Sequence, residues 1–176
     1  MTLRLEDWDR HRLASRSDDV LEVYAEAMEV SRGAARSRRS VLAAHLEREG
    51  LAGVAALEDE RLIGIAYGYQ GAPGQWWHDH VRAAMGPRLA QEWLRDAFEV
   101  CELHVRPAYQ QQGIGRDLLV RLLGQTRALT AVLTTPDAET RARTFYRDAG
   151  WVDLVRELRF PGDPRSFAVL GLDLHG

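Results

Sequence analysis

The sequence predicts a mixed α/β fold in which helices cover both faces of one β-sheet. Two kinds of pattern support this prediction. Short apolar runs with turn residues at their ends predict strands, whereas apolar residues at intervals of three and four predict helices. In the second half of the chain these patterns alternate as strand, helix, strand, helix and then two strands, an order typical of a mixed sheet. At 176 residues the chain fits about one domain, so we expect a single domain over residues 1–176.

The first fifty residues predict one strand and two helices. The strand is expected within residues 3–13. Ser17 precedes Asp18 and Asp19, and a serine followed by acids is typical of a helix N-terminus, so we expect Ser17 to cap a helix there. A second helix is expected over about residues 40–49, with Gly50 ending it.

A β-hairpin and a helical insertion follow. Residues 54–57 and 62–69 predict two strands joined by a turn over residues 58–60. The segment of about residues 70–97 is then expected to form two helices, at 76–85 and 88–96. We interpret this segment as an insertion between the third and fourth strands.

The remaining elements alternate more regularly. A strand over 98–105 leads through a glycine-bearing loop at 110–115 into a helix with a leucine stripe. A strand over 131–134, a helix over 139–149 and two final strands at 152–158 and 167–172 complete the prediction.

The composition excludes several classes of function. All 23 basic residues are arginine and there is no lysine, which excludes a Walker-type phosphate loop and lysine Schiff-base chemistry. The net charge of −3 argues against a general nucleic-acid binder. No apolar run is long enough for a membrane span, and residues 1–10 lack the apolar core of a signal peptide, so we expect a cytoplasmic protein. The single cysteine, Cys101, rules out an internal disulfide, and we expect it to be buried and inert.

The loop after the strand at 98–105 is the most informative segment. It reads Glu-Leu-His-Val-Arg-Pro-Ala-Tyr-Gln-Gln-Gln-Gly-Ile-Gly-Arg over residues 102–116. Glycines at the start of a helix allow a tight turn, and the free N–H groups there lie at the positive end of the helix dipole. Such a place favours a phosphate group, and a diphosphate is the natural ligand.

This loop resembles motif A of the GNAT (Gcn5-related) N-acetyltransferase family, whose core pattern is Gln/Arg-x-x-Gly-x-Gly/Ala. A second block, residues 142–151, is similar to the family's Ala-x-x-hydrophobic-Tyr-x-x-x-Gly-aromatic segment. The resemblance covers about two thirds of the chain. It implies a three-layer α-β-α domain whose central mixed, mostly antiparallel sheet is splayed at the cofactor site, and it implies acetyl-CoA as co-substrate with no metal.

The resemblance also assigns cofactor-binding residues. Backbone groups of three strand residues would contact the pantetheine arm, and the loop would hold the diphosphate. Where the family often has an asparagine that helps to hold that arm, this chain has Glu139. The residues assigned to the cofactor are Leu103, His104, Val105, Gln110, Gln111, Gln112, Gly113, Ile114, Gly115, Arg116, Glu139 and Tyr146.

Three residues are candidates for acid–base catalysis. Tyr146 matches the family's acid beside the departing thiolate, although it could simply pack beside Phe145. For the base, Glu102 is the first choice and Glu99 the second. Strand alternation puts Glu102 and His104 on one face and Glu99 on the other; either carboxylate could instead be an ordinary exposed strand residue.

Two other clusters of polar and aromatic residues each allow two interpretations of their role. Trp76, Trp77 and His78 line either an acceptor pocket or the core of the inserted helix, and the His-x-His pair with Asp79 is too small a ligand set for a metal. A cluster of Arg36, Arg38 and Arg39 is expected to form a solvated face, with the 3′-phosphate of the cofactor or an acidic partner as the alternative.

We therefore expect an N-acetyltransferase that transfers an acetyl group to a primary amine of a small molecule or peptide. The alternative from a different class is a non-catalytic acyl-CoA-binding module. Relatives in the family often form homodimers, and nothing in the chain decides this point.

Overall fold

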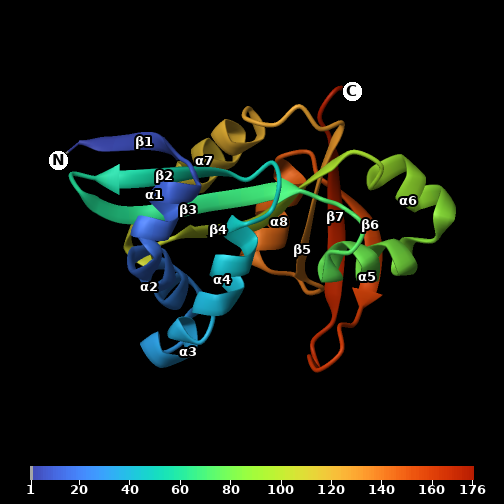
Figure 1. Ribbon diagram of the computed structural model, residues 1–176, viewed down its shortest axis with the longest axis horizontal. Helices are drawn as coiled ribbons and strands as arrows, with labels where there is room; N and C mark the ends of the chain where they lie inside the picture. Colours follow the sequence, from blue (N-terminus) through green and yellow to red (C-terminus); the bar gives the residue numbers. More distant parts are fainter. Residues whose placement is uncertain (1) are drawn as a thin grey trace. The chain divides into compact units, whose positions relative to one another are not determined.

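The computed structural model describes residues 2–176, which form two compact units. The first contains residues up to 69 together with residues 100–127, and the second contains residues 70–99 and 128–176. Strand β4 (Ala97–Val105) passes from the second unit into the first. Figure 1 gives the element labels used below.

The first unit contains four strands, which follow the order β1-β2-β3-β4. The antiparallel strands β1, β2 and β3 pair in sequence, and a two-residue turn at Asp59-Glu60 joins β2 to β3. Asp59 takes a left-handed conformation there, with φ 53°. The elements of this unit are β1 (Leu3–Trp8), α1 (Arg10–Ser15), α2 (Ser17–Met28), α3 (Arg32–Arg36), α4 (Arg39–Leu46), β2 (Ala52–Glu58), β3 (Arg61–Gln70), the 3-10 turn η1 (Pro107–Tyr109) and α7 (Ile114–Leu123).

The core of the first unit lies between its strands and α1–α4, which Figure 1 shows gathered beside β1–β3. Leu13, Val23 and Leu42 from these helices pack with Leu57 and Ile65 from the strands. On β3, Gly64 faces Leu118 of α7, and a Cβ there would come within 3.0 Å of that leucine. Since Gly64 and Ile65 are neighbours in a strand, α7 covers the face opposite to α1–α4.

The second unit combines parallel and antiparallel strands in the order β4-β5-β7-β6. Residues 97–99 of β4 pair in parallel with 130–132 of β5, and β7 pairs antiparallel with β5 and β6. Val81 of α5, Ala90 of α6 and Leu94, the residue after α6, pack against Val132 and Val169. Its other elements are α5 (Trp76–Met85), α6 (Pro87–Trp93), β5 (Thr130–Pro136), α8 (Arg141–Asp148), β6 (Val152–Leu158) and β7 (Phe167–Asp173).

These strands confirm the predicted fold class, a mixed and mostly antiparallel sheet with helices packed against it. The prediction missed α1 and α3, which have only six and five residues, too short for a clear apolar repeat. The prediction that Ser17 caps a helix was wrong, because Arg16 occupies the cap position and Ser17 Oγ donates to the carbonyl of Ala14 at 2.8 Å. Helix α1 ends at Ser15, so the Ser17 hydroxyl lies next to the carbonyl groups of its last turn and donates to one of them.

Candidate functional site

The loop between β4 and α7 carries two left-handed residues in a short span. Gln111 has φ 63° and Gly113 has φ 85°. Glycine accepts such a conformation at little cost, and Gly113 is the residue from which α7 begins. Pro107 opens the turn η1 just before, so the chain reverses sharply between the strand and the helix.

The backbone N–H groups of residues 111–116 have no hydrogen-bond partner within residues 2–176. The N–H groups on either side of this run do have partners: that of Gln110 donates to the Pro107 carbonyl at 3.3 Å, and that of Asp117 donates to the Gly113 carbonyl at 3.0 Å. Six consecutive donors are thus available at the N-terminus of a ten-residue helix. This is the arrangement that binds a phosphate or diphosphate without a cationic side chain.

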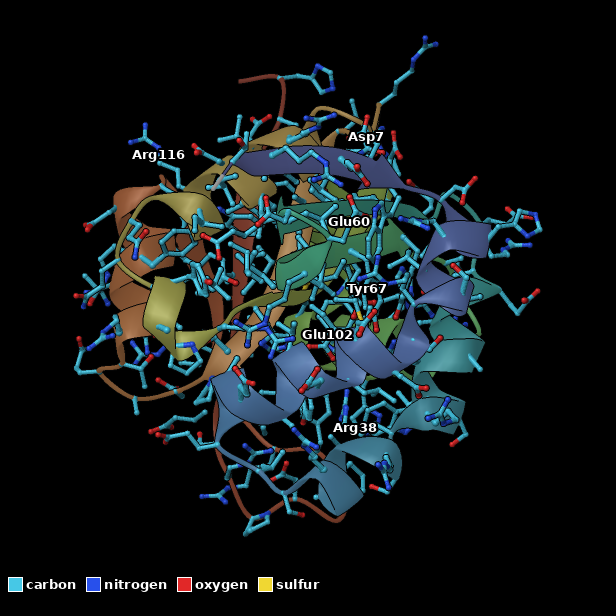
Figure 2. The ribbon with its side chains drawn as sticks, turned by 90° about the vertical axis from the view of Figure 1, so that its left-hand side faces the viewer. Asp7, Arg38, Glu60, Tyr67, Glu102 and Arg116 are labelled. Carbon is cyan, nitrogen blue, oxygen red and sulfur yellow. The ribbon has the colours of Figure 1, made fainter. Side chains whose placement is uncertain are left out.

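The glutamines of the loop are oriented differently from one another. Gln110 Nε2 donates to the Val105 carbonyl at 2.9 Å, so its side chain ties the loop to the end of β4. Gln112 Nε2 makes a longer contact of 3.5 Å with the Ala108 carbonyl. Arg116 is exposed, and Figure 2 shows its guanidinium pointing away from the unit. The residues assigned to the diphosphate therefore offer mainly backbone groups.

Glu102 lies in a cluster of polar side chains beneath α2 and α4. One of its oxygens, Oε1, accepts a hydrogen bond from Arg38 Nη2 at 2.9 Å. The other, Oε2, lies 2.5 Å from His104 Nε2, which confirms that Glu102 and His104 share a face of β4. Figure 2 shows Glu102 near Arg38 and Tyr67.

These contacts keep Glu102 ionised. Burial by itself would raise the pKa of the carboxyl group, but the hydrogen bond from His104 and the electrostatic interactions with His104, Arg38 and His45 outweigh burial and lower it. The Glu102 side chain is only 15% exposed. A cavity of about 20 Å³, room for about one water molecule, is lined by Val20, Leu21, Tyr24, Arg38, Leu42, Ile65, Tyr67, Glu102 and His104.

A second group of polar residues adjoins this cluster. His45 Nδ1 lies 2.9 Å from the Tyr67 hydroxyl and 3.4 Å from Cys101 Sγ. Burial lowers the pKa of His45 and raises the pKa of Tyr67 well above its ordinary value, so both side chains favour their neutral forms. Cys101 is half-buried rather than buried as predicted, and it packs against the core of the first unit beside the His45 imidazole.

The remaining acid–base candidates belong to the second unit. Glu99 is buried in the part of β4 that pairs with β5. Tyr146 is half-buried on α8, with its ring 5.1 Å from that of Phe145 and 5.6 Å from that of Trp151. Glu139 lies just before α8 with its side chain 78% exposed and 3.8 Å from Arg147. Their catalytic and binding roles stay predictions.

The aromatic residues of α5 separate into two environments. His78 is 3% exposed, and Trp77 packs on the core of the second unit while donating to Thr134 Oγ1 at 3.3 Å. Trp76 is 56% exposed, and its ring contacts those of Phe160 and His80 in tilted arrangements with centroid distances of 5.3 and 4.9 Å. Within the part of the chain that the structure describes, no group of His, Cys, Asp or Glu residues is arranged to hold a metal ion.

The position of Arg38 beside Glu102 is a feature that the sequence did not reveal. The prediction of a solvated face was wrong for it, because its guanidinium binds Glu102 and lies 4.7 Å above the ring of Tyr24. Tyr24, His45 and Tyr67 were missed as well. They come from three elements far apart in sequence, and no local pattern links them.

Comparison with known proteins shows which family the chain resembles. The model of the acetyltransferase (GNAT) family matches residues 17–151. A GCN5-like protein acetyltransferase of Mycobacterium tuberculosis is 35% identical, with 99% of each chain covered. The PaiA N-acetyltransferase of Thermoplasma acidophilum, solved in complex with coenzyme A, is 15% identical with a TM-score of 0.65, covering 98% of this chain and 99% of that chain. An acetyltransferase of the GNAT family from Streptococcus pneumoniae gives 12% identity and a TM-score of 0.65, covering 98% and 100%.

The fold and the donor loop place the chain among acyltransferases that take their acyl group from a coenzyme A thioester. The family model spans most of the chain, and the chain belongs to the acetyltransferase (GNAT) family. Membership confirms the predicted enzyme class and acetyl-CoA as its co-substrate. None of the helices within residues 2–176 is long and apolar enough to cross a membrane.

Proposed function

We propose that this enzyme transfers the acetyl group of acetyl-CoA to a primary amine on a protein or peptide. The observation that carries the proposal is the run of six unpartnered N–H groups over residues 111–116. It supplies what the diphosphate of coenzyme A requires, and it lies in the motif by which the family was recognised.

Bound acetyl-CoA supplies an acetyl group activated as a thioester. The protein has to remove a proton from the acceptor ammonium, because only the neutral amine is a nucleophile. It also has to donate a proton to the departing thiolate. We propose Tyr146 for the second task, from its position in the motif; Glu102 and its neighbours in the first unit are the proposed source of the base. Glu99 stays the second candidate.

A protein or peptide acceptor is favoured over a small metabolite by the 35% identical relative, whose name describes a protein acetyltransferase. That relative and this chain match over 99% of each chain. Homodimer formation and a cytoplasmic location stay predictions.

The test has a binding arm and a catalytic arm. Calorimetry should detect binding of coenzyme A and much weaker binding of 4′-phosphopantetheine, which lacks the diphosphate. Thiol release from acetyl-CoA is then measured with lysine-containing peptides, peptides with a free N-terminus as their only amine, and small amines. Because the chain contains no lysine, any acetyllysine detected by mass spectrometry comes from the added substrate.

We expect turnover with at least one peptide class to exceed that with small amines by tenfold or more in kcat/KM. Equal or better turnover of small amines would overturn the acceptor class. Equal binding of coenzyme A and 4′-phosphopantetheine would overturn the role of the loop.

A further inference from the structure

Both carboxylate oxygens of Glu102 are already engaged. Oε1 accepts from Arg38 at 2.9 Å and Oε2 lies 2.5 Å from His104 Nε2. A carboxylate bound by a guanidinium and an imidazole, and with its pKa lowered by those contacts, is a weak proton acceptor. The arrangement therefore does not offer Glu102 itself to an incoming ammonium group.

The contact with Glu102 determines the tautomer of His104. An ionised carboxylate only accepts hydrogen bonds, so Nε2 of His104 has to carry the proton that lies between them. In the neutral ring Nδ1 is then an unprotonated acceptor. It has no hydrogen-bond partner within residues 2–176, and it is not among the buried unsatisfied atoms there. It consequently keeps some contact with solvent, although the side chain is only 12% exposed.

We propose that His104 is the general base of the acetyl transfer and that Glu102, held by Arg38, is the residue that positions it. This proposal rests on the proposed function. It reassigns the base from the carboxylate to the imidazole, whose side chain the sequence left without a role.

The surroundings of His104 hold the ring in place. The ring of Tyr24, from α2, meets it edge-on with centroids 5.3 Å apart. Arg38, the residue before α4, donates to Glu102 and lies over the ring of Tyr24 at 4.7 Å from its centroid. The other titratable groups facing the cluster are His45 from α4, Tyr67 from β3 and Cys101 from β4. Two of these, His45 and Tyr67, favour neutral forms, which leaves Glu102 and Arg38 as the charged pair beside the imidazole.

The proposed acetyl transfer moves two protons, forms one bond and breaks one bond. His104 Nδ1 takes one proton from the acceptor ammonium and later releases it to solvent. The amine nitrogen then forms a bond to the carbonyl carbon of the acetyl group, and the bond from that carbon to sulfur breaks. The second proton lost by the nitrogen ends on the sulfur of coenzyme A, so the net reaction releases one proton.

The tautomer can be tested without any substrate. Nitrogen-15 NMR of the ligand-free protein should show that the neutral form of His104 carries its proton on Nε2. The signals are assigned by their loss in His104→Gln. A proton on Nδ1 instead would overturn the proposal, because that nitrogen would have no lone pair to offer.

The kinetic test compares His104→Gln with Glu102→Gln. We expect His104→Gln to lower kcat by about 10²–10⁴ and to abolish the loss of kcat at acidic pH. Glu102→Gln should lower kcat about ten- to a hundredfold and retain that acid limb, since the imidazole is still present. His11→Gln, the same substitution at an exposed position of α1, should keep the wild-type profile and serves as the matched control.

A structural role for His104 is separated from a catalytic one by rescue. Imidazole added to His104→Ala should restore part of the turnover, whereas a folding defect would not respond to it. If His104→Gln retains the acid limb and Glu102→Gln loses it, Glu102 is the base and the proposal is overturned. Failure of the proposed function gives a different result, in which the wild-type enzyme binds coenzyme A and releases no thiol with any amine.

Discussion

Glu102 shows how its neighbours change what a buried carboxylate can do. Burial raises the pKa of Glu102, and the hydrogen bond and electrostatic interaction with His104, followed by the charge of Arg38, lower it. With Arg38 and His104 bound to it, the carboxylate stays ionised and accepts hydrogen bonds from both. The chemistry of this strand residue therefore depends on an arginine 64 positions earlier in the chain.

The hydroxyl group of Tyr146 provides the corresponding test on the thiolate side. Tyr146→Phe keeps the ring and its contacts with Phe145 and Trp151 while removing the only acidic proton of the side chain. We expect kcat to fall about a hundredfold and the dissociation constant of acetyl-CoA, measured by calorimetry, to stay within twofold. Unchanged turnover would remove Tyr146 from the mechanism.

Among the elements, the junction between β4 and α7 depends most directly on local backbone geometry. Gly113 has φ 85°, and a Cβ added there meets no atom within 4 Å. An alanine would therefore introduce backbone strain without a steric clash. Any loss of cofactor affinity would then come from the altered directions of the N–H groups.

Gly162 supplies a matched control for this substitution. It has φ 82°, also with no atom within 4 Å of an added Cβ, and lies in the turn between β6 and β7. We expect Gly113→Ala and Gly162→Ala each to lower the free energy of unfolding by about 1 kcal/mol, as measured by urea denaturation. Only Gly113→Ala should weaken coenzyme A binding, by about tenfold or 1.4 kcal/mol. Equal affinities for the two variants would contradict the assigned role of the loop.

The elements could be predicted from the sequence to the extent that their signals are local. The apolar runs gave the strands, and the glycines at 113 and 115 with the leucines after them gave the loop and α7. Even the shared face of Glu102 and His104 followed from strand alternation. The short helices α1 and α3 were missed because six or five residues contain less than two full turns.

The side-chain cluster around Glu102 could not be predicted, for a different reason. The cluster draws its side chains from separate elements: Tyr24 from α2, Arg38 from the residue before α4, His45 from α4 and Tyr67 from β3. Their proximity results from packing over separations of tens of residues, which periodicity does not encode. The sequence thus located the carboxylate but not the groups that set its protonation state.

For the whole molecule, the pH dependence of stability follows from carboxylates that are ionised in the folded state. The side chain of Asp137 is only 3% exposed, and it accepts hydrogen bonds from Arg143 at 2.7 Å, from Arg156 and from the N–H of Glu157. The hydrogen bonds from Arg156 and Glu157, opposed by desolvation and reinforced by Arg143, hold the pKa of Asp137 far below its ordinary value of 3.8. A lowered pKa contributes stability that is fully present above the unfolded value and is lost as the pH falls through the folded value.

We therefore expect Asp137→Asn to lower the free energy of unfolding at pH 7 by about 3 kcal/mol, because Arg143 is buried and loses a charged partner. The difference in unfolding free energy between this variant and wild type should shrink progressively below pH 4. In that range Asp137 of the unfolded chain becomes protonated while Asp137 of the folded protein stays ionised. Asp163→Asn is the control: the pKa of Asp163 is also lowered, to about 2, by Arg165, but that ion pair is at the surface and should contribute little. Urea denaturation from pH 2.5 to 8 measures both variants. A pH-independent difference for Asp137→Asn would show that its loss of stability comes from packing rather than from the ionised carboxylate.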